Sequence, residues 1–232
     1  MKTVIDRALS RGHADHGWLQ TYHTFSFADY YNPQRVHFGA LRVLNDDTVA
    51  PLEGFGRHPH NNMEVISIPL KGSMRHGDSL EHSEVISPGM IQLMSTGTGI
   101  YHSEYNESDT EPLEFLQIWV IPDKQNTKPK YENHDIRPLV KQNEISTFIC
   151  PDSAIDILQE AWFSMANLDK GIIREYKLHG HHTGVYIFVI EGSVKVGDAI
   201  LGRRDGMGIW STTCFEIEAL EKSQVLLIEV AM

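Results

Sequence analysis

The stretch GFGRHPHNNMEVISIPLKG, residues 54–72, places two histidines one residue apart in front of an apolar run that ends in glycine. Alternate residues of a β-strand point to the same side, so His58 and His60 can reach one metal ion together from a strand. Two ligands do not hold a catalytic metal well. Further ligands must therefore come from another part of the chain.

Residues 97–106, GTGIYHSEYN, contain a second pair with the same spacing, His102 and Glu104. If the two strands lie side by side, three imidazoles and one carboxylate converge on one ion. This donor set suits Fe, Mn, Co, Ni, Cu or Zn better than Mg or Ca. An octahedral ion with these four ligands would keep two adjacent positions open for a bidentate oxygen substrate, or for a substrate and dioxygen.

Two glutamates near these histidines have alternative roles. Glu64 could be a fifth ligand, but we favour a role in which it orients a ligand histidine by accepting the other ring N–H. Glu104 could bind the metal continuously, or it could act as a base near the open positions. Glu104 is therefore the candidate catalytic residue as well as a candidate ligand.

Short β-branched and aromatic runs bounded by turn residues recur along the chain and predict strands. They fall at residues 41–50, 63–72, 113–122, 184–197 and 223–230. Glycine and proline recur about every ten residues, as expected for a sandwich or barrel. Residues 155–168 are ambiguous, because their apolar residues also fit a helical stripe.

An internal repeat predicts two related β-barrels, the second of them altered. PLKGSMRHG, residues 69–77, and VIEGSVKVG, residues 189–197, both give the order strand, Gly-Ser, short strand, Gly, and we interpret this as a repeated hairpin turn. Upstream of the second copy, His179 and His181 repeat the histidine spacing, but no histidine follows His182. We therefore interpret these three histidines as turn or surface residues rather than as a second metal site.

The polar segment 122–146 contains three prolines and is typical of a linker. We expect an N-terminal domain with the metal site at residues 1–125, a linker at 126–145, and a degenerate C-terminal domain at 146–232. The expected fold class is all-β, with two barrels in one chain.

Composition excludes several classes of function. The net charge of −11 disfavours direct binding to nucleic acid. No apolar run approaches the ~18 residues of a membrane helix, and the N-terminus carries charges where a signal peptide is apolar. The two cysteines, Cys150 and Cys214, are too few for a disulfide framework and are consistent with a reducing compartment. We expect a cytoplasmic protein that does not act at a membrane.

With these motifs assembled, the chain resembles the pirin family of the cupin superfamily. The two cupin motifs correspond to HPHNNMEVISIPLKG, residues 58–72, and PGMIQLMSTGTGIYHSEYN, residues 88–106. RGHADHGWLQTYHTFSFADYYNP, residues 11–33, is similar to pirins rather than to cupins in general. The resemblance covers the N-terminal half, is looser after about residue 125, and is greatest to short bacterial pirin-like proteins described as quercetin 2,3-dioxygenases.

The resemblance implies a bicupin, two double-stranded β-helix (jelly-roll) barrels, with one metal ion in the N-terminal barrel. It places the family's ligands on His58, His60, His102 and Glu104, and implies a monomer in which the metal is commonly iron. The implied activity is opening of a flavonol ring, as in quercetin, with O2. A different reading within the family is an iron-dependent redox sensor that acts through protein partners. Phe25, Phe27 and Phe55 could line a flavonol pocket, although we expect each to pack in the core.

Overall fold

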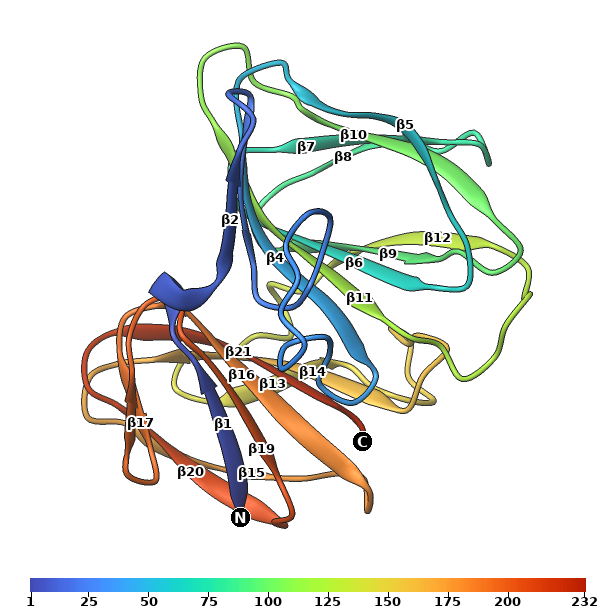
Figure 1. Cartoon of the computed structure of the whole chain (residues 1–232). Coiled ribbons are helices and arrows are strands. Elements are labelled where there is room, and N and C mark those ends of the chain that lie inside the picture. The colour runs from blue at the N-terminus through green and yellow to red at the C-terminus, as the bar shows by residue number, and fades with distance from the viewer. The chain divides into compact units, whose positions relative to one another are not determined.

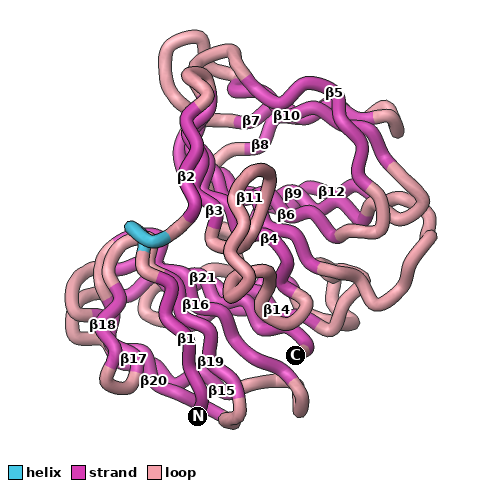
Figure 2. The backbone as a smooth tube through the Cα atoms, viewed as in Figure 1, coloured by secondary structure: helices cyan, strands magenta, loops and turns pink.

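The computed structural model describes all 232 residues. The chain consists almost entirely of β-strands joined by turns, with one short 3-10 helix, η1 (Ala8–Ser10), and no α-helix (Figure 2). No helix is long and apolar enough to cross a membrane. The predicted all-β class is confirmed. The chain forms two compact units.

The first unit comprises residues 12–37 and 41–136. It has a seven-stranded sheet, in the order β12-β9-β6-β11-β4-β3-β2, and a four-stranded sheet, β5-β10-β7-β8 (Figure 1). Every pair of neighbouring strands is antiparallel. The strands are β2 (Gly12–Asp15), β3 (Leu19–His23), β4 (Leu41–Val49), β5 (Gly54–His60), β6 (Glu64–Lys71), β7 (Met74–Asp78), β8 (Ser83–Ile86), β9 (Met90–Ser95), β10 (Ile100–Asn106), β11 (Leu113–Val120) and β12 (Lys130–Asp135).

Two apolar clusters join the two sheets of this unit. One joins Phe115 of β11 and Leu19 of β3 to Met74 and Ile86, which lie on β7 and β8 of the smaller sheet. The other joins Val65, Met94 and Ile100. Both clusters contain residues from the two sheets, so the sheets pack face to face and leave room for buried polar groups at other positions.

The second unit comprises residues 1–11, 38–40 and 137–232. A six-stranded sheet, β1-β19-β16-β21-β14-β13, packs on a four-stranded sheet, β15-β20-β17-β18, around one continuous apolar cluster. The strands are β1 (Lys2–Asp6), β13 (Ile145–Ile149), β14 (Ala161–Leu168), β15 (Ile173–Lys177), β16 (Thr183–Glu191), β17 (Val194–Val196), β18 (Ala199–Leu201), β19 (Gly206–Trp210), β20 (Cys214–Ala219) and β21 (Ser223–Ala231). Each unit is therefore a two-sheet jelly-roll barrel, as predicted.

The extents of the two units differ from the predicted domains at 1–125 and 146–232. Strand β1 pairs with β19, so the N-terminal residues belong to the second unit. Strand β12 lies inside the predicted linker, 126–145, and pairs with β9 at the edge of the seven-stranded sheet. Its polar sequence resembled a linker because an edge strand exposes much of its length. The ambiguous segment 155–168 contains a strand, β14, and no helix.

The repeated Gly-Ser turn is not a hairpin. In the first unit it leads from β6 to β7, and in the second from β16 to β17, which in both cases lie in different sheets. The turn therefore carries the chain around a corner of the barrel. Gly72 and Gly192 have φ values of 75° and 86°, and a Cβ would lie 2.9 Å and 2.4 Å from a backbone oxygen, so glycine is required at both corners.

Candidate metal centre

The two residue pairs identified in the sequence, His58 with His60 and His102 with Glu104, lie on neighbouring strands of the four-stranded sheet. Strand β10 pairs antiparallel with β5, with His102 opposite His58 and Ile100 opposite His60. Pro59 can separate the two β5 histidines because β5 is the edge strand, where a missing N–H need not cost a ladder hydrogen bond. Directly paired and alternate residues share a face, so His58, His60 and His102 point the same way.

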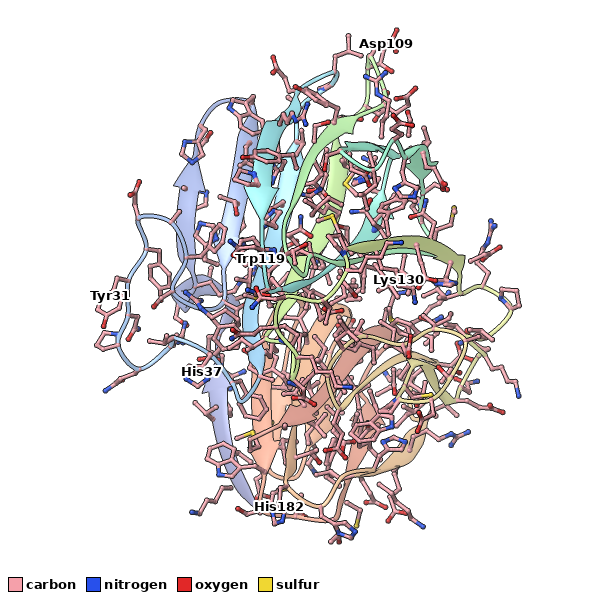
Figure 3. All side chains as sticks on the ribbon, turned by 90° about the vertical axis from the view of Figure 1, so that its right-hand side faces the viewer. Tyr31, His37, Asp109, Trp119, Lys130 and His182 are labelled. Atoms are coloured by element: carbon pink, nitrogen blue, oxygen red, sulfur yellow. The ribbon has the colours of Figure 1, made fainter.

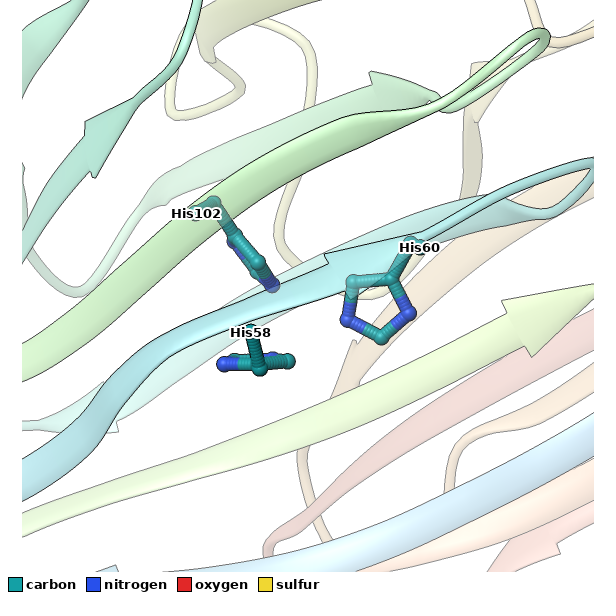
Figure 4. Close-up of side chains that lie close together, drawn as sticks. All are labelled: His58, His60 and His102. Atoms are coloured by element: carbon teal, nitrogen blue, oxygen red, sulfur yellow. The ribbon is translucent and has the colours of Figure 1, made fainter.

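The three imidazoles form a compact cluster (Figure 4). A ring nitrogen of each lies within 4.8 Å of the others. The ring centroids are 4.4 Å apart for His58 and His102, 4.8 Å for His60 and His102, and 4.9 Å for His58 and His60. Nitrogens gathered in this way can close on one transition-metal ion.

Two of the three imidazoles, those of His60 and His102, are held in the neutral form that binds metals. Burial lowers the pKa of His60 to about 3, assisted by His102 and His58. Burial also lowers the pKa of His102 to about 3, assisted by His58 and His76. His58 Nδ1 lies 2.8 Å from the carbonyl oxygen of Gly56, so that Nδ1–H donates and Nε2 keeps its lone pair.

His102 gives the strongest indication that a metal ion fits here. Its side chain is 0% exposed, and neither ring nitrogen has a hydrogen-bond partner. A buried polar group without a partner costs about 1–3 kcal/mol, and such groups are rare in folded proteins. A metal ion bound to one ring nitrogen would remove the part of this cost that belongs to that nitrogen.

Glu104 lies two residues after His102 on β10 and is 2% exposed. Its carboxylate is not within the 4.8 Å group formed by the imidazoles, but it lines the same pocket as His58 and His60. Three neutral side chains donate to it. Ser67 Oγ and Gln92 Nε2 lie 3.0 and 3.1 Å from Oε1, and Gln117 Nε2 lies 2.8 Å from Oε2.

These three donors were missed in the sequence analysis. They come from β6, β9 and β11 and meet only through the order of strands in the larger sheet. Each is a polar residue inside an otherwise apolar strand, MEVISIPLKG, MIQLMS and LEFLQIWVIP. A buried polar group in such a run needs a partner, and this was the available signal.

Glu64 is not brought together with the histidines. Alternation along β6 directs it to the opposite face from Ser67, which hydrogen-bonds to Glu104. Its carboxylate accepts a hydrogen bond from Ser95 Oγ at 2.6 Å. The contact with Ser95 does not involve a ligand histidine, and the favoured role of orienting one stays a prediction.

A pocket of about 290 Å³ opens beside the imidazoles, at the lower end of the range for small-molecule sites. Phe27, Phe55 and Trp119 form apolar walls. Trp119, near the end of β11 (Figure 3), packs edge-on against His60 at 4.9 Å and against Phe27 at 5.3 Å. Phe27 and Phe55 thus line the pocket, although core packing was the expected role for each. Phe25 is buried and does not line the pocket.

A second polar cluster, formed by His76, Asp78 and His82, lies next to His102. His76, 5.5 Å from the His102 ring, donates to Asp78 at 3.0 Å, and His82 donates to the same carboxylate at 2.9 Å. Burial opposes ionisation of Asp78, but the hydrogen bonds from His76 and His82 hold its pKa below the ordinary value. Tyr131 of β12 stacks between the two histidine rings.

The C-terminal barrel has a different arrangement at the position of the repeat. His179 Nδ1 donates to Glu229 at 2.9 Å, and its ring stacks on Trp162. Glu229 also accepts from the backbone N–H groups of His179 and Gly180, and from the hydroxyls of Tyr176 and Thr183. His179 is therefore part of a turn that is anchored on a buried carboxylate.

Comparison with known proteins agrees with this architecture. The family described as Pirin matches residues 4–120, and the family described as Quercetinase C-terminal cupin domain matches residues 150–230. A quercetin 2,3-dioxygenase of Escherichia coli K12 is 37% identical over 226 residues, which cover 97% of both chains. A putative quercetin 2,3-dioxygenase of Pseudomonas aeruginosa is 38% identical over 224 residues, covering 95% of this chain and 96% of the relative.

Among solved structures, the crystal structure of the bacterial pirin YhhW from Escherichia coli in complex with nickel(II) superposes with a TM-score of 0.94 at 36% identity, over 99% of both chains. The sequence resemblance is thus confirmed in both halves of the chain, including the half where the motifs are weaker. This chain belongs to the pirin family and has its architecture of two cupin domains.

Proposed function

We propose that this chain is a metal-dependent dioxygenase that opens the ring of a flavonol such as quercetin with O2. It would use one divalent transition-metal ion, which we propose to be Fe(II), held by His58, His60, His102 and Glu104. The observation that carries the proposal is the cluster of imidazoles at the wall of an apolar pocket, with the two nitrogens of His102 buried and unpartnered. The names of the relatives support the same reaction.

When bound, the metal ion would supply Lewis-acid binding of the substrate oxygens and the means to use O2. The net reaction consumes one O2 and converts the flavonol to a depside and carbon monoxide. The structure bears on the contribution of the chain, which is to bind the flavonol, move its proton and exclude water.

Glu104 is the residue placed to move the proton. Its carboxylate would accept the proton of the flavonol 3-hydroxyl, at least transiently, and leave an electron-rich enolate that can react with O2. Gln92 donates to one oxygen of this carboxylate and Gln117 to the other, and two such hydrogen bonds restrict rotation of the group.

The aromatic walls are suited to a flat substrate. Phe27, Phe55 and Trp119 line the pocket, and flavonol rings can pack against them. Filling a pocket of this size with a rigid aromatic molecule displaces water from the imidazoles and Glu104. Electrostatic interactions with the developing enolate are stronger once water has been excluded.

The test is turnover of quercetin by the metal-loaded protein. The protein would be loaded with Fe(II), Mn, Co, Ni, Cu or Zn in turn, and the loss of quercetin absorbance followed together with O2 uptake. We expect one of these ions to support turnover, and His60→Ala to abolish it. Glu104→Gln, which keeps the shape but loses the base, should lower kcat by about 10²–10⁴-fold.

His181→Ala is the matched control, because this histidine lies in a turn of the other unit and should leave kcat unchanged. Stoichiometric metal with no turnover of any flavonol would refute the proposal and would favour the alternative, an iron-dependent redox sensor. A comparison of the proteins captured by the ferrous and ferric forms would then test that alternative.

A further inference from the structure

The pocket contains a buried acidic group to which the proposed mechanism assigns no role. Asp47 lies on β4 of the seven-stranded sheet and lines the pocket together with Thr21 of β3. It is 3% exposed, and its Oδ1 atom has no hydrogen-bond partner. The hydroxyl of Thr21 hydrogen-bonds to the carboxyl group.

The surroundings of Asp47 do not explain why a carboxyl group is there. Burial raises its pKa to about 7, with a further contribution from Asp46 and Glu104, and no ion pair with lysine or arginine offsets the burial. An unpartnered buried oxygen costs about 1–3 kcal/mol. Phe115, its paired residue on β11, belongs to an apolar cluster with Leu19, so a leucine could fill the same space at lower cost.

Asp47 and the imidazoles come from different sheets of the same barrel. The histidines lie on β5 and β10 of the four-stranded sheet, whereas Asp47 and Thr21 lie on the larger sheet that packs against it. Both groups line one pocket, and its apolar walls are aromatic. A flat ligand that fills the pocket therefore meets polar groups of two kinds, the metal-binding cluster and a carboxyl oxygen that lacks a donor.

The chemistry of this oxygen defines what it can recognise. A carboxyl oxygen accepts a hydrogen bond when ionised and can donate one when protonated, so the complementary ligand group is an uncharged group that can do either, such as a hydroxyl. A ligand carboxylate is disfavoured, because it cannot donate to Asp47 and would place a further carboxyl group beside those of Asp47 and Glu104. A phenolic hydroxyl on an aromatic ring meets both requirements and fits the aromatic walls.

We propose that Asp47 recognises a phenolic hydroxyl of the substrate through Oδ1, so that the site selects flavonols that carry a hydroxyl besides the oxygens at the metal-binding end. The inference rests on the proposed function for the flavonol skeleton. The recognised group itself follows from the unpartnered oxygen, because a site built to hydrogen-bond a hydroxyl discriminates strongly against an analogue that lacks it.

The test compares two probes that share the metal-binding oxygens. Quercetin has further hydroxyls on its rings, whereas 3-hydroxyflavone has no hydroxyl other than the shared 3-hydroxyl. Their dissociation constants would be measured by calorimetry on metal-free and metal-loaded protein, so that turnover is not needed. We expect the wild-type protein to bind quercetin at least about tenfold more tightly than 3-hydroxyflavone.

Asp47→Leu is the decisive variant. It should reduce the preference for quercetin to about twofold or less without weakening the binding of 3-hydroxyflavone, since the leucine fills the same space. Asp47→Asn keeps an acceptor oxygen and should retain part of the preference for quercetin. This variant replaces Asp47→Leu in the test if the leucine variant does not fold. Asp109→Asn is the control, because it removes an aspartate from an exposed loop.

The outcomes separate this inference from the proposed function. Selective binding of quercetin that depends on Asp47, without turnover, supports hydroxyl recognition and refutes the dioxygenase. Turnover with equal affinities for the two probes refutes hydroxyl recognition and leaves the dioxygenase standing. A preference for quercetin that persists unchanged in both Asp47 variants also overturns the inference, as does failure of quercetin to bind either form of the protein.

Discussion

Asp47→Asn should make the metal-free protein more stable at alkaline pH. In the folded protein burial raises the pKa of Asp47 from 3.8 to about 7, assisted by Asp46 and Glu104 and opposed by the hydrogen bond from Thr21. The folded state therefore holds this proton more tightly than the unfolded state does. The stabilisation associated with the protonated carboxyl is fully present below pH 3.8 and is lost as the pH rises towards 7.

The magnitude follows from the same two pKa values. At about 1.4 kcal/mol per pH unit, the free energy of unfolding of the wild type loses about 4 kcal/mol across the whole window. Between pH 4.5 and 8.5 the loss is about 3 kcal/mol, because part of it has occurred below pH 4.5. A domain is stable by only about 5–15 kcal/mol, so a change of this size is readily measured.

The assay is urea denaturation of chelator-treated protein at several pH values from 4.5 to 8.5, followed by circular dichroism. Asparagine has nearly the same shape and no titration, so the variant should gain about 3 kcal/mol relative to the wild type over this range. Asp109→Asn removes one negative charge from an exposed loop and is the control. If the difference between Asp47→Asn and wild type stays constant with pH, burial does not hold Asp47 in its protonated form and the reasoning fails.

Three further predictions concern the ligands, the groups that support them and the second barrel. His102→Ala should reduce bound metal, measured by elemental analysis, well below one ion per chain, whereas His181→Ala should not. Gln117→Leu leaves one oxygen of Glu104 without its donor and should weaken metal binding about 10–100-fold in a competition assay with a chromophoric chelator; unchanged affinity would contradict the supporting role. Burial opposes ionisation of Glu229, but hydrogen bonds, the strongest from the Gly180 N–H, hold its pKa below 4.5. The ionised carboxylate therefore stabilises the folded protein above pH 4.5, and this stabilisation is lost as the pH falls through the folded-state pKa. Glu229→Gln should therefore show a shallower loss of unfolding free energy between pH 5 and 3, and a slope equal to that of the wild type would disprove it.

The strands and the histidine cluster could be predicted because both depend on local rules. Alternation along a strand places His58 and His60 on one face, and only one further assumption, the pairing of β5 with β10, was needed to add His102. The donors to Glu104 depend on the order of strands within the larger sheet. Nothing in the spacing of Ser67, Gln92 and Gln117 indicates that β9, β6 and β11 are neighbours.

Other features depended on long-range pairing in the same way. Strand β1 completes a sheet whose other strands begin more than a hundred residues later, so no local pattern could assign it to the second unit. Strand β12 has a polar sequence because it is an edge strand, and Tyr131 is the buried residue that marks it. Asp47 stands in the run LRVLNDDTVA beside another aspartate, and only the register of β4 shows that one of the two is buried in the pocket.

The two barrels share a fold but satisfy their buried polar groups differently, and this difference accounts for a single metal centre. In the C-terminal barrel Glu229 is 0% exposed, but two backbone N–H groups, two hydroxyls and His179 all donate to it. Its lone pairs are used by the chain itself, so a cation would have to displace existing hydrogen bonds. In the N-terminal barrel His102 is equally buried and has no partner at either nitrogen. A group from outside the chain can remove part of that cost, and a metal cation is a group that binds clustered imidazoles beside a carboxylate.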